Sequence, residues 1–364
     1  MVIVMRQTNK EKIKGAIYGQ IIGDALGVPV ERKTRYDLLL DPIDGMTGGE
    51  NTSHKLPPGR WSDDGSLTLA TVDSLLKNNS LNTSDLIDRF VGWYHRGHYT
   101  PDGKSFGSGG TTRNAIAHFI KHRDPKTCGG DKPWNNGNGS LMRILPLTFY
   151  MNKFDPAFED RYRIVKSASA LTHANKISVL ACTYLVSFAQ ILADNFNKYE
   201  AYNQLRLHFI SEMADNSNLD LLDDTNTAYR QVDLSWIDPF KRLLYGNIYD
   251  LPEDAIDSGF YVIETLEAAI WCIMTTDSFE SAVLTAVNMG GDSDSTAAVV
   301  GGLAGLIYGF EAIPQQWVDE LPRQKYLYDI IEEFADRFEM DIEDWYTDEE
   351  DEIPDEDDDD SITP

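Results

Sequence analysis

The sequence predicts an all-α protein built as one compact domain. Through most of the chain, apolar residues recur every three or four positions, which places them on one face of a helix. Alternating apolar and polar residues joined by short turns, the pattern of β-hairpins, are scarce. Hydrophobic residues make up 42% of the 364 residues, enough for a large core. We expect residues 1–346 to form this domain and residues 347–364 to form an acidic, disordered tail.

The charge of the chain is acidic and unevenly distributed. The formal net charge is −27, and residues 348–360 contribute eleven Asp and Glu without any Lys or Arg. The rest of the chain holds 48 acidic residues against 32 basic residues, a net charge of −16. Because binding to the phosphates of nucleic acid requires a basic face, we expect no direct nucleic-acid partner.

Cysteine content and hydrophobic runs predict a cytoplasmic protein without a membrane span. Cys128, Cys182 and Cys272 are far apart and odd in number, as is typical of buried thiols in a reducing compartment. The apolar start of the chain is too short for a secretion signal. Residues 177–193 form the most apolar run, but the run includes polar side chains and therefore predicts a buried core helix.

The first predicted helix, residues 12–26, carries a stripe of glycines at intervals of four residues. These are Gly15, Gly19, Gly23 and Gly27. Such a smooth face lets another helix pack very closely. Asp24 lies on this helix, and residues 28–30 then lead the chain out to Glu31. Taken alone, Glu31 is more typical of a solvated surface acid.

A first acidic turn, Ser62-Asp63-Asp64, follows a polar loop over residues 48–60 and begins the next apolar helical pattern. Burying the adjacent carboxylates of Asp63 and Asp64 would be costly unless a cation neutralised them. The alternative is an exposed turn in which one Asp caps the helix. The sequence leaves both interpretations open.

Two glycine-rich turns are candidates for binding a phosphate, because successive backbone N–H groups point toward a bound anion. The first lies between predicted helices over residues 84–96 and 112–121 and contains Gly107, Ser108, Gly109 and Gly110. The second precedes an apolar helix that ends before Pro146 and contains Asn135, Asn136, Gly137, Asn138 and Gly139. A flexible loop would have the same composition.

Two further polar residues follow the second turn. Arg143 either neutralises a phosphate or pairs with a core carboxylate, and we favour the structural pairing. His173 ends a predicted helix over residues 162–171, where it either interacts with the helix dipole or faces a cleft. Additional helices are predicted over residues 176–194, 199–214, 258–275, 278–289 and 325–337, whereas residues 215–257 show no clear pattern.

A second acidic turn begins the most distinctive stretch of the chain, residues 288–309. Gly290 and Gly291 end one helical pattern, and a new one begins near Ser295. Alternate residues of an extended turn share a side, so Asp292 and Asp294 can direct their carboxylates to one point together with the Ser295 hydroxyl. Three oxygen ligands suit Mg²⁺. An N-cap role would explain one carboxylate but not both, so we favour a metal or phosphate site.

Five motifs in the chain resemble those of the ADP-ribosylglycohydrolase family, in the same order and across most of residues 12–340. They are G-x-x-x-G-x-x-x-G-D-A-L-G-x-P-x-E at 15–31, W-S-D-D at 61–64, G-N-G-S-L-M-R-I at 137–144, T-H at 172–173 and G-G-D-S-D-S at 290–295. This resemblance implies a single orthogonal helical bundle with two Mg²⁺ ions, or Mn²⁺ instead, at the base of an ADP-ribose cleft.

The resemblance also implies roles for individual residues. The metal ligands would be Ser62, Asp63, Asp64, Asp292, Asp294 and Ser295. Glu31 would lie over the metals near the scissile bond. The turn 135–139 and the loop 107–110 would hold the diphosphate, His173 would contact the distal ribose, and Tyr261 would line the cleft.

The implied activity is hydrolysis of the N- or O-glycosidic bond between ADP-ribose and an acceptor, either a protein side chain such as arginine or a small molecule. A water made more acidic by the metals would attack the glycosidic carbon. Glu31 is the first candidate for the acid or base, and Asp63 and Asp294 are the alternative candidates. Gly65 stands where the family usually has Thr, and Gly107 where it often has Asp. An ADP-ribose-binding module with weakened catalysis and a two-metal nucleotide phosphohydrolase are the alternatives.

Overall fold

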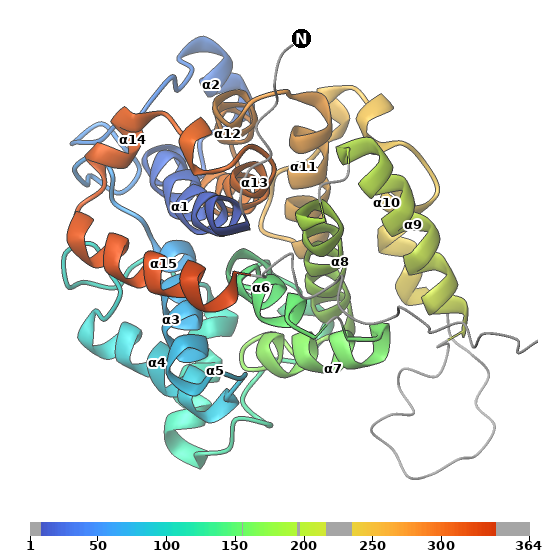
Figure 1. Cartoon of the computed structure of the whole chain (residues 1–364). Helices are drawn as coiled ribbons and strands as arrows, with labels where there is room; N and C mark the ends of the chain where they lie inside the picture. The colour runs from blue at the N-terminus through green and yellow to red at the C-terminus, as the bar shows by residue number, and fades with distance from the viewer. Residues whose placement is uncertain (1–8, 155, 195–196, 216–234, 340–364) are drawn as a thin grey trace, which may run out of the picture.

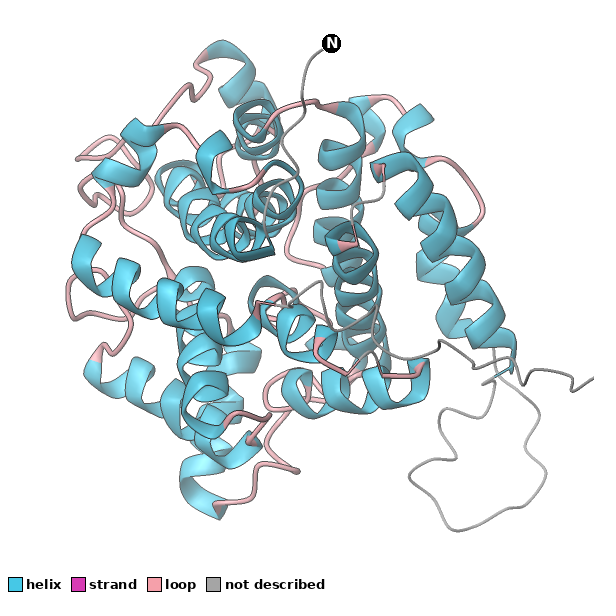
Figure 2. Cartoon of the chain, in the orientation of Figure 1, coloured by secondary structure: helices cyan, strands magenta, loops and turns pink. Residues whose placement is uncertain are grey.

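The computed structural model describes residues 9–154, 156–194, 197–215 and 235–339. Within these ranges the chain forms helices joined by loops, and no strand occurs (Figure 2). The prediction of an all-α fold is therefore confirmed. The predicted acidic tail, residues 347–364, lies outside the described residues.

The α-helices follow one another along the whole described chain and correspond to most of the predicted helical patterns. They are α1 (Asn9–Gly27), α2 (Arg35–Leu40), α3 (Asp63–Asn78), α4 (Thr83–Arg96), α5 (Gly110–His122), α6 (Pro146–Asn152), α7 (Phe158–Ser169), α8 (Lys176–Ala193), α9 (Lys198–Asp215), α10 (Lys241–Leu244), α11 (Val262–Thr275), α12 (Phe279–Asn288), α13 (Ser293–Tyr308), α14 (Gln315–Glu320) and α15 (Gln324–Phe338). In Figure 1, α8 and α11 run upright whereas α15 lies across the view, so the helices form an orthogonal bundle.

Two predicted helical stretches are not α-helical. The segment before Pro146 forms only a short 3-10 turn, Leu141–Arg143. Residues 258–261, predicted as the start of a helix, form a loop before α11, because the carbonyls of Ser258 and Phe260 accept hydrogen bonds from distant segments instead of from the next helical turn. Asp292 N donates to Ser258 O at 2.7 Å, and Val262 N donates to Asn136 O at 3.0 Å.

Helices α1 and α13 run antiparallel with their backbones in contact, and they lie side by side at the centre of the bundle (Figure 1). Every residue from Gly15 to Gly27 is buried. A Cβ atom on a glycine of α1 would collide with a carbonyl of α13: Gly15 with Gly305, Gly19 with Gly301, and Gly23 with Ala297. The close helix packing predicted from the glycine stripe is thus confirmed.

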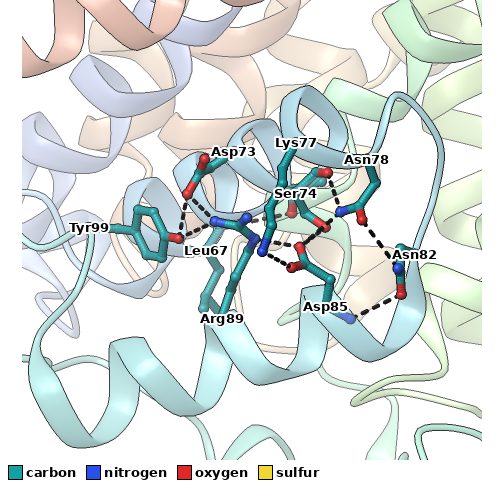
Figure 3. A network of polar contacts seen from close by, with 10 residues as sticks. Leu67, Asp73, Ser74, Lys77, Asn78, Asn82, Asp85, Arg89 and Tyr99 are labelled. Carbon is teal, nitrogen blue, oxygen red and sulfur yellow. Dashed lines mark hydrogen bonds and ion pairs between the residues drawn. The ribbon is translucent and has the colours of Figure 1, made fainter.

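Helix α3 is tied to α4 by a polar network centred on Arg89 (Figure 3). Arg89 Nη1 pairs with Asp73 of α3, and Arg89 Nε donates to Asp85 at 2.6 Å. The hydroxyl of Tyr99 donates to the same Asp73 carboxylate at 2.7 Å. The network holds the helix that begins with the first acidic turn.

Helix α8 is the core helix predicted from the most apolar run. It has the length and composition to cross a membrane, but 78% of its 18 residues are buried inside the protein. The three cysteines are free and buried, as predicted. The burial of α8 by other helices explains its apolar composition without a lipid environment.

Candidate active site

The two acidic turns, which are separated by more than two hundred residues, meet in the interior of the bundle. One carboxylate oxygen from each of Asp24, Asp64 and Asp294 lies within 4.8 Å of the others. The same holds for Glu31, Asp292 and Asp294, so Asp294 joins the two groups. We call these five residues, with the buried Asp63, the carboxylate cluster.

The second acidic turn is positioned by two glycines whose backbone conformation is unfavourable for other residue types. Gly290 and Gly291 have φ angles of +72° and +68°, in the left-handed region that favours glycine. Arg32 N donates to Gly291 O at 2.7 Å, and Gly291 N donates to Lys33 O at 2.8 Å. This backbone pairing places Glu31 beside the start of α13.

Helix capping does not account for the acidic turns. The N-cap of α3 is Ser62, whose Oγ accepts from Asp64 N at 3.3 Å and donates to Asp64 Oδ2 at 2.9 Å. Asp292 stands at the N-cap position of α13, but its side chain makes no capping hydrogen bond. The alternative in which an aspartate caps each helix is therefore wrong, and the carboxylates remain for another purpose.

Asp24 belongs to the cluster although its role was not predicted from the sequence. Its carboxylate accepts hydrogen bonds from Ser62 N at 2.9 Å and from Gly65 N at 2.7 Å. Asp24 thereby joins α1 to the first turn of α3. The available signal was an acid between Gly23 and Gly27 on a helix face that glycine spacing predicts to be buried.

The ionised form of the cluster is unfavourable unless positive charge is present to balance the buried carboxylates. Burial, reinforced by the charge of Asp294, raises the pKa of Asp24 to about 8. Burial and the neighbouring carboxylates also raise the pKa of Asp63, Asp64 and Asp292 well above its ordinary value. The buried Oδ1 of Asp64 has no hydrogen-bond partner among the described residues. Closely spaced carboxylate oxygens of this kind fit hard divalent cations.

Glu31 lies at the edge of the cluster between two basic side chains. His54 Nε2 contacts Glu31 Oε2, and Arg32 Nε lies 3.2 Å from Oε1. Burial alone would raise the pKa of Glu31, but the interactions with His54 and Arg32 outweigh burial and lower it. The His54 ring lies 5.3 Å from that of Phe106. His54 was missed because the polar loop over 48–60 has no pattern that distinguishes it.

The turn 135–139 is connected to the carboxylate cluster through Asn138. Its side-chain amide donates to Asp292 Oδ2 at 2.5 Å and to Thr265 Oγ1 at 2.8 Å. Gly137 pairs in antiparallel fashion with the backbone of Tyr261. Asn135 Nδ2 donates to Thr111 Oγ1 at 3.2 Å, which links the turn to α5. The turn thus lies between the cluster and the start of α5.

His173 lies directly behind this turn. The residue is buried, with 3% of its surface exposed. A Cβ atom on Gly139 would lie 2.8 Å from His173 Cε1, and one on Gly137 would lie 3.7 Å from its Nε2. Arg143, for which a carboxylate partner was predicted, instead donates to Thr172 Oγ1 and Ala168 O. That prediction was wrong.

Of the remaining predicted site residues, the loop 107–110 contacts the cluster at Gly107, and the Ser295 hydroxyl contacts a methionine. Gly107 lies against Asp63, whereas a Cβ atom on Gly109 or Gly110 would face open space. The Ser295 hydroxyl contacts the sulfur of Met142 at 4.0 Å. The proposed roles of Ser295 as a metal ligand and of loop 107–110 in diphosphate binding stay predictions.

Comparison with known proteins identifies the family. The family model described as ADP-ribosylglycohydrolase matches residues 5–348, which contain the whole carboxylate cluster. The chain belongs to this family. Because ADP-ribosylglycohydrolases hydrolyse glycosidic bonds, the protein is an enzyme of that class.

Individual relatives cover nearly the same length. The chain is 29% identical over 333 residues to "ADP-ribosylarginine hydrolase Tri1" of Serratia proteamaculans (strain 568), covering 91% of this chain and 81% of the relative. It is 26% identical to "ADP-ribosyl-[dinitrogen reductase] glycohydrolase" of Rhodospirillum rubrum, covering 85% and 90%. A solved structure described as "ADP-ribosylglycohydrolase-related protein complex" matches with a TM-score of 0.67 and 27% identity, covering 92% of this chain and 99% of that chain.

Gly65 and Gly107, where the resemblance led us to expect Thr and Asp, are both closely packed in this ADP-ribosylglycohydrolase. A Cβ atom on Gly65 would lie 2.9 Å from the ring of the buried Trp61. A Cβ atom on Gly107 would collide with Asp63 Oδ1, and the backbone there has a φ of +90°. A side chain at position 65 would therefore require Trp61 to shift, and one at position 107 would require Asp63 to shift.

Proposed function

We propose that this ADP-ribosylglycohydrolase releases ADP-ribose from an arginine side chain of a protein, using two divalent cations held in the carboxylate cluster, Mg²⁺ or Mn²⁺. The observation that carries the proposal is the convergence of the two acidic turns beside Glu31 and the turn 135–139. The choice of arginine is supported by the name of the Serratia relative, an ADP-ribosylarginine hydrolase.

The residues present fit two cations. Asp64, with its unpartnered Oδ1, and Asp292 and Asp294, with their clustered oxygens, are the main candidates to hold them. Asp63, Ser62 and Ser295 remain the other proposed ligands, and Asp24 lies close enough to Asp64 and Asp294 to contribute. Bound divalent cations would neutralise these acids and supply the positive charge that orients hydroxyl groups and acidifies water.

Glu31 is our candidate for the proton-transferring residue. Its lowered pKa means that the carboxylate is ionised at neutral pH, which suits a general base that accepts a proton from water. Its Oε2 contacts His54 Nε2, so His54 is placed to hold this carboxylate in position. Negative charge beside the anomeric carbon also stabilises the oxocarbenium-like transition state of glycosidic cleavage.

The substrate-binding roles that we propose are those implied by the family resemblance, and the arrangement around the cluster supports them. We assign the diphosphate to the backbone of the turn 135–139 and the loop 107–110, and the distal ribose to the neighbourhood of His173. Tyr261 is half-buried and paired with Gly137 of the same turn, which supports its proposed role in lining the cleft.

The decisive experiment compares ADP-ribose release from one peptide modified on arginine and from a second modified on serine, with Mg²⁺ or with EDTA. We expect release from the arginine peptide only, with Mg²⁺ only, and a loss of at least about a hundredfold in Asp292→Ala and Asp294→Ala. Asp44→Asn, which changes an exposed carboxylate, is the matched control.

Any other result of this experiment would overturn a specific part of the proposed function. Release from the serine peptide would overturn the assignment of the acceptor, and full activity in EDTA would overturn the cations. ADP-ribose binding without release would indicate the binding module that Gly65 and Gly107 suggest. Release of inorganic phosphate from a nucleotide would indicate a phosphohydrolase.

A further inference from the structure

Arg143 is a fully buried arginine that has no carboxylate partner among the residues that the structure describes. Its Nη2 donates to Thr172 Oγ1 at 2.9 Å and to Ala168 O at 3.3 Å, and its guanidinium carbon lies 4.5 Å from the centre of the Phe90 ring. Its Nε and Nη1 have no hydrogen-bond partner in the described part of the chain. Burying a charge in this way is costly. We therefore asked what the one side-chain acceptor of Arg143, the Thr172 hydroxyl, does in turn.

The chemistry of arginine fixes the direction of the hydrogen bond between Arg143 and Thr172. A guanidinium group can only donate, so Thr172 Oγ1 accepts from Arg143. The buried Thr172 hydroxyl then needs an acceptor for its own hydrogen, and His173 Nδ1 lies 2.8 Å from Oγ1. A hydroxyl that donates to Nδ1 requires this nitrogen to be without a proton, and the neutral ring then carries its proton on Nε2.

The orientation of the His173 ring directs Nε2 toward the turn 135–139. The backbone of His173 is held by hydrogen bonds with Ser169 on both sides, from His173 N to Ser169 O at 2.8 Å and from Ser169 Oγ to His173 O at 2.9 Å. Nε2 faces Gly137 and Gly139, where the absence of side chains leaves room beside it. Burial and the charge of Arg143 lower the pKa of His173 to about 3, so the ring stays neutral and only one nitrogen can donate.

We propose that Arg143 is a positioning residue which, through Thr172, holds His173 in the tautomer with its proton on Nε2, so that His173 donates a hydrogen bond to an oxygen of a ligand bound at the turn 135–139. The proposal rests on the proposed function only for the identity of the ligand, ADP-ribose. The relay itself, Arg143 to Thr172 to His173, is a property of the protein without ligand.

The relay is tested by ¹⁵N NMR of histidine-labelled protein, in which long-range ¹H–¹⁵N correlations distinguish a protonated from a bare ring nitrogen. His173→Gln identifies the signal. Thr172→Val removes the hydroxyl at nearly constant volume, and Thr172→Ser keeps it as the matched control. The affinity for ADP-ribose is measured by calorimetry in the presence of Mg²⁺, at a temperature where thermal unfolding shows every variant folded.

We expect Nε2–H in the wild type and in Thr172→Ser. In Thr172→Val, a population with the proton on Nδ1 should appear and the affinity for ADP-ribose should fall about tenfold, the effect of losing one hydrogen bond of ordinary strength. A wild-type ring protonated on Nδ1 would overturn the relay, even if Thr172→Val fails to fold. An unchanged affinity in a variant with a changed tautomer would overturn its role in ligand binding.

The outcomes also separate this inference from the proposed function. If the wild type releases ADP-ribose from no acceptor, yet its ADP-ribose affinity follows the tautomer across the variants, the proposed function fails and the relay stands. If release occurs but the ring carries its proton on Nδ1, the relay fails alone.

Discussion

The side-chain amide of Asn138 donates a hydrogen bond to the carboxylate of Asp292 over 2.5 Å. Because Asn138 also belongs to the turn 135–139, this one contact joins the proposed diphosphate turn to the carboxylate cluster. Both residues are buried, so neither can exchange the contact for bulk water.

Replacing Asn138 by Ala should therefore impair both the proposed binding of cations by the carboxylate cluster and the proposed binding of diphosphate by the turn 135–139. Asp292 would lose the donor that favours its ionised form, and a substitution of this kind beside a metal ligand typically costs about tenfold to a hundredfold in metal affinity or activity. We expect the Mg²⁺ concentration needed for half-maximal activity to rise by at least about tenfold. Asn51→Ala, at an exposed position, should have no effect, and wild-type metal dependence in Asn138→Ala would contradict the link.

Gly107→Ala should disturb the site through Asp63, because the added methyl group would collide with its carboxylate. Gly103 offers a matched control, since its φ of +83° is similar to the +90° of Gly107 but its neighbourhood is empty within 4 Å. Both variants should lose about 1–3 kcal/mol of stability from backbone strain. Only Gly107→Ala should also lose activity, and equal activity in the two variants would refute the steric explanation.

Gly19→Ala should destabilise the whole bundle, because the new methyl group would collide with the Gly301 carbonyl and separate α1 from α13. We expect a loss of about 1–3 kcal/mol in the free energy of unfolding, measured by urea titration, the range seen for overpacked cores. Gly110→Ala, on a helix with no atom within 4 Å of the added Cβ, should be neutral or slightly stabilising. Wild-type stability of Gly19→Ala would show that the helices can yield.

The dependence of stability on pH should reveal the carboxylate cluster in metal-free protein. Asp24 has a pKa of about 8 when folded but about 4 when unfolded. Between these values the unfolded chain binds fewer protons than the folded one, so the free energy of unfolding falls as pH rises. Because cations bind the ionised carboxylates, added Mg²⁺ should raise the melting temperature more at pH 8 than at pH 6.

Calorimetric melting curves at the two pH values, each with EDTA and with Mg²⁺, measure this difference. The same experiment on Asp292→Asn, which lacks one ionisable group of the cluster, should show a smaller response to Mg²⁺. A response that is equal at both pH values in the wild type would contradict cation binding by the ionised cluster.

The sequence predicted the helices and their closest packing because both depend on local patterns. Helical periodicity identified α1, α8 and α13, and the spacing of glycines on α1 predicted close packing by another helix, which the structure shows to be α13. The acidic residues of both turns were identified as candidates for the same chemistry. Their meeting in space could be expected only through the family resemblance, since nothing in either turn specifies the other.

The remaining features depend on tertiary contacts that leave little trace in the sequence. Asp24 receives its role from the backbone N–H groups of another helix, and His54 receives its role from Glu31. Arg143 was expected to seek a carboxylate, as buried arginines usually do, but it contacts Thr172 instead. No pattern of residue types distinguishes these partners before the chain is folded.

The central pair of helices has one more consequence, for how acceptors are selected. Asp24 and Asp294 lie on α1 and α13, whose backbones are in contact. By contrast, His54, Phe106 and Phe260 lie in loops between helices. Because His54 contacts Glu31, substitutions at Phe106 or Phe260 are the ones we expect to change which acceptor binds while the carboxylates of α1 and α13 stay in place.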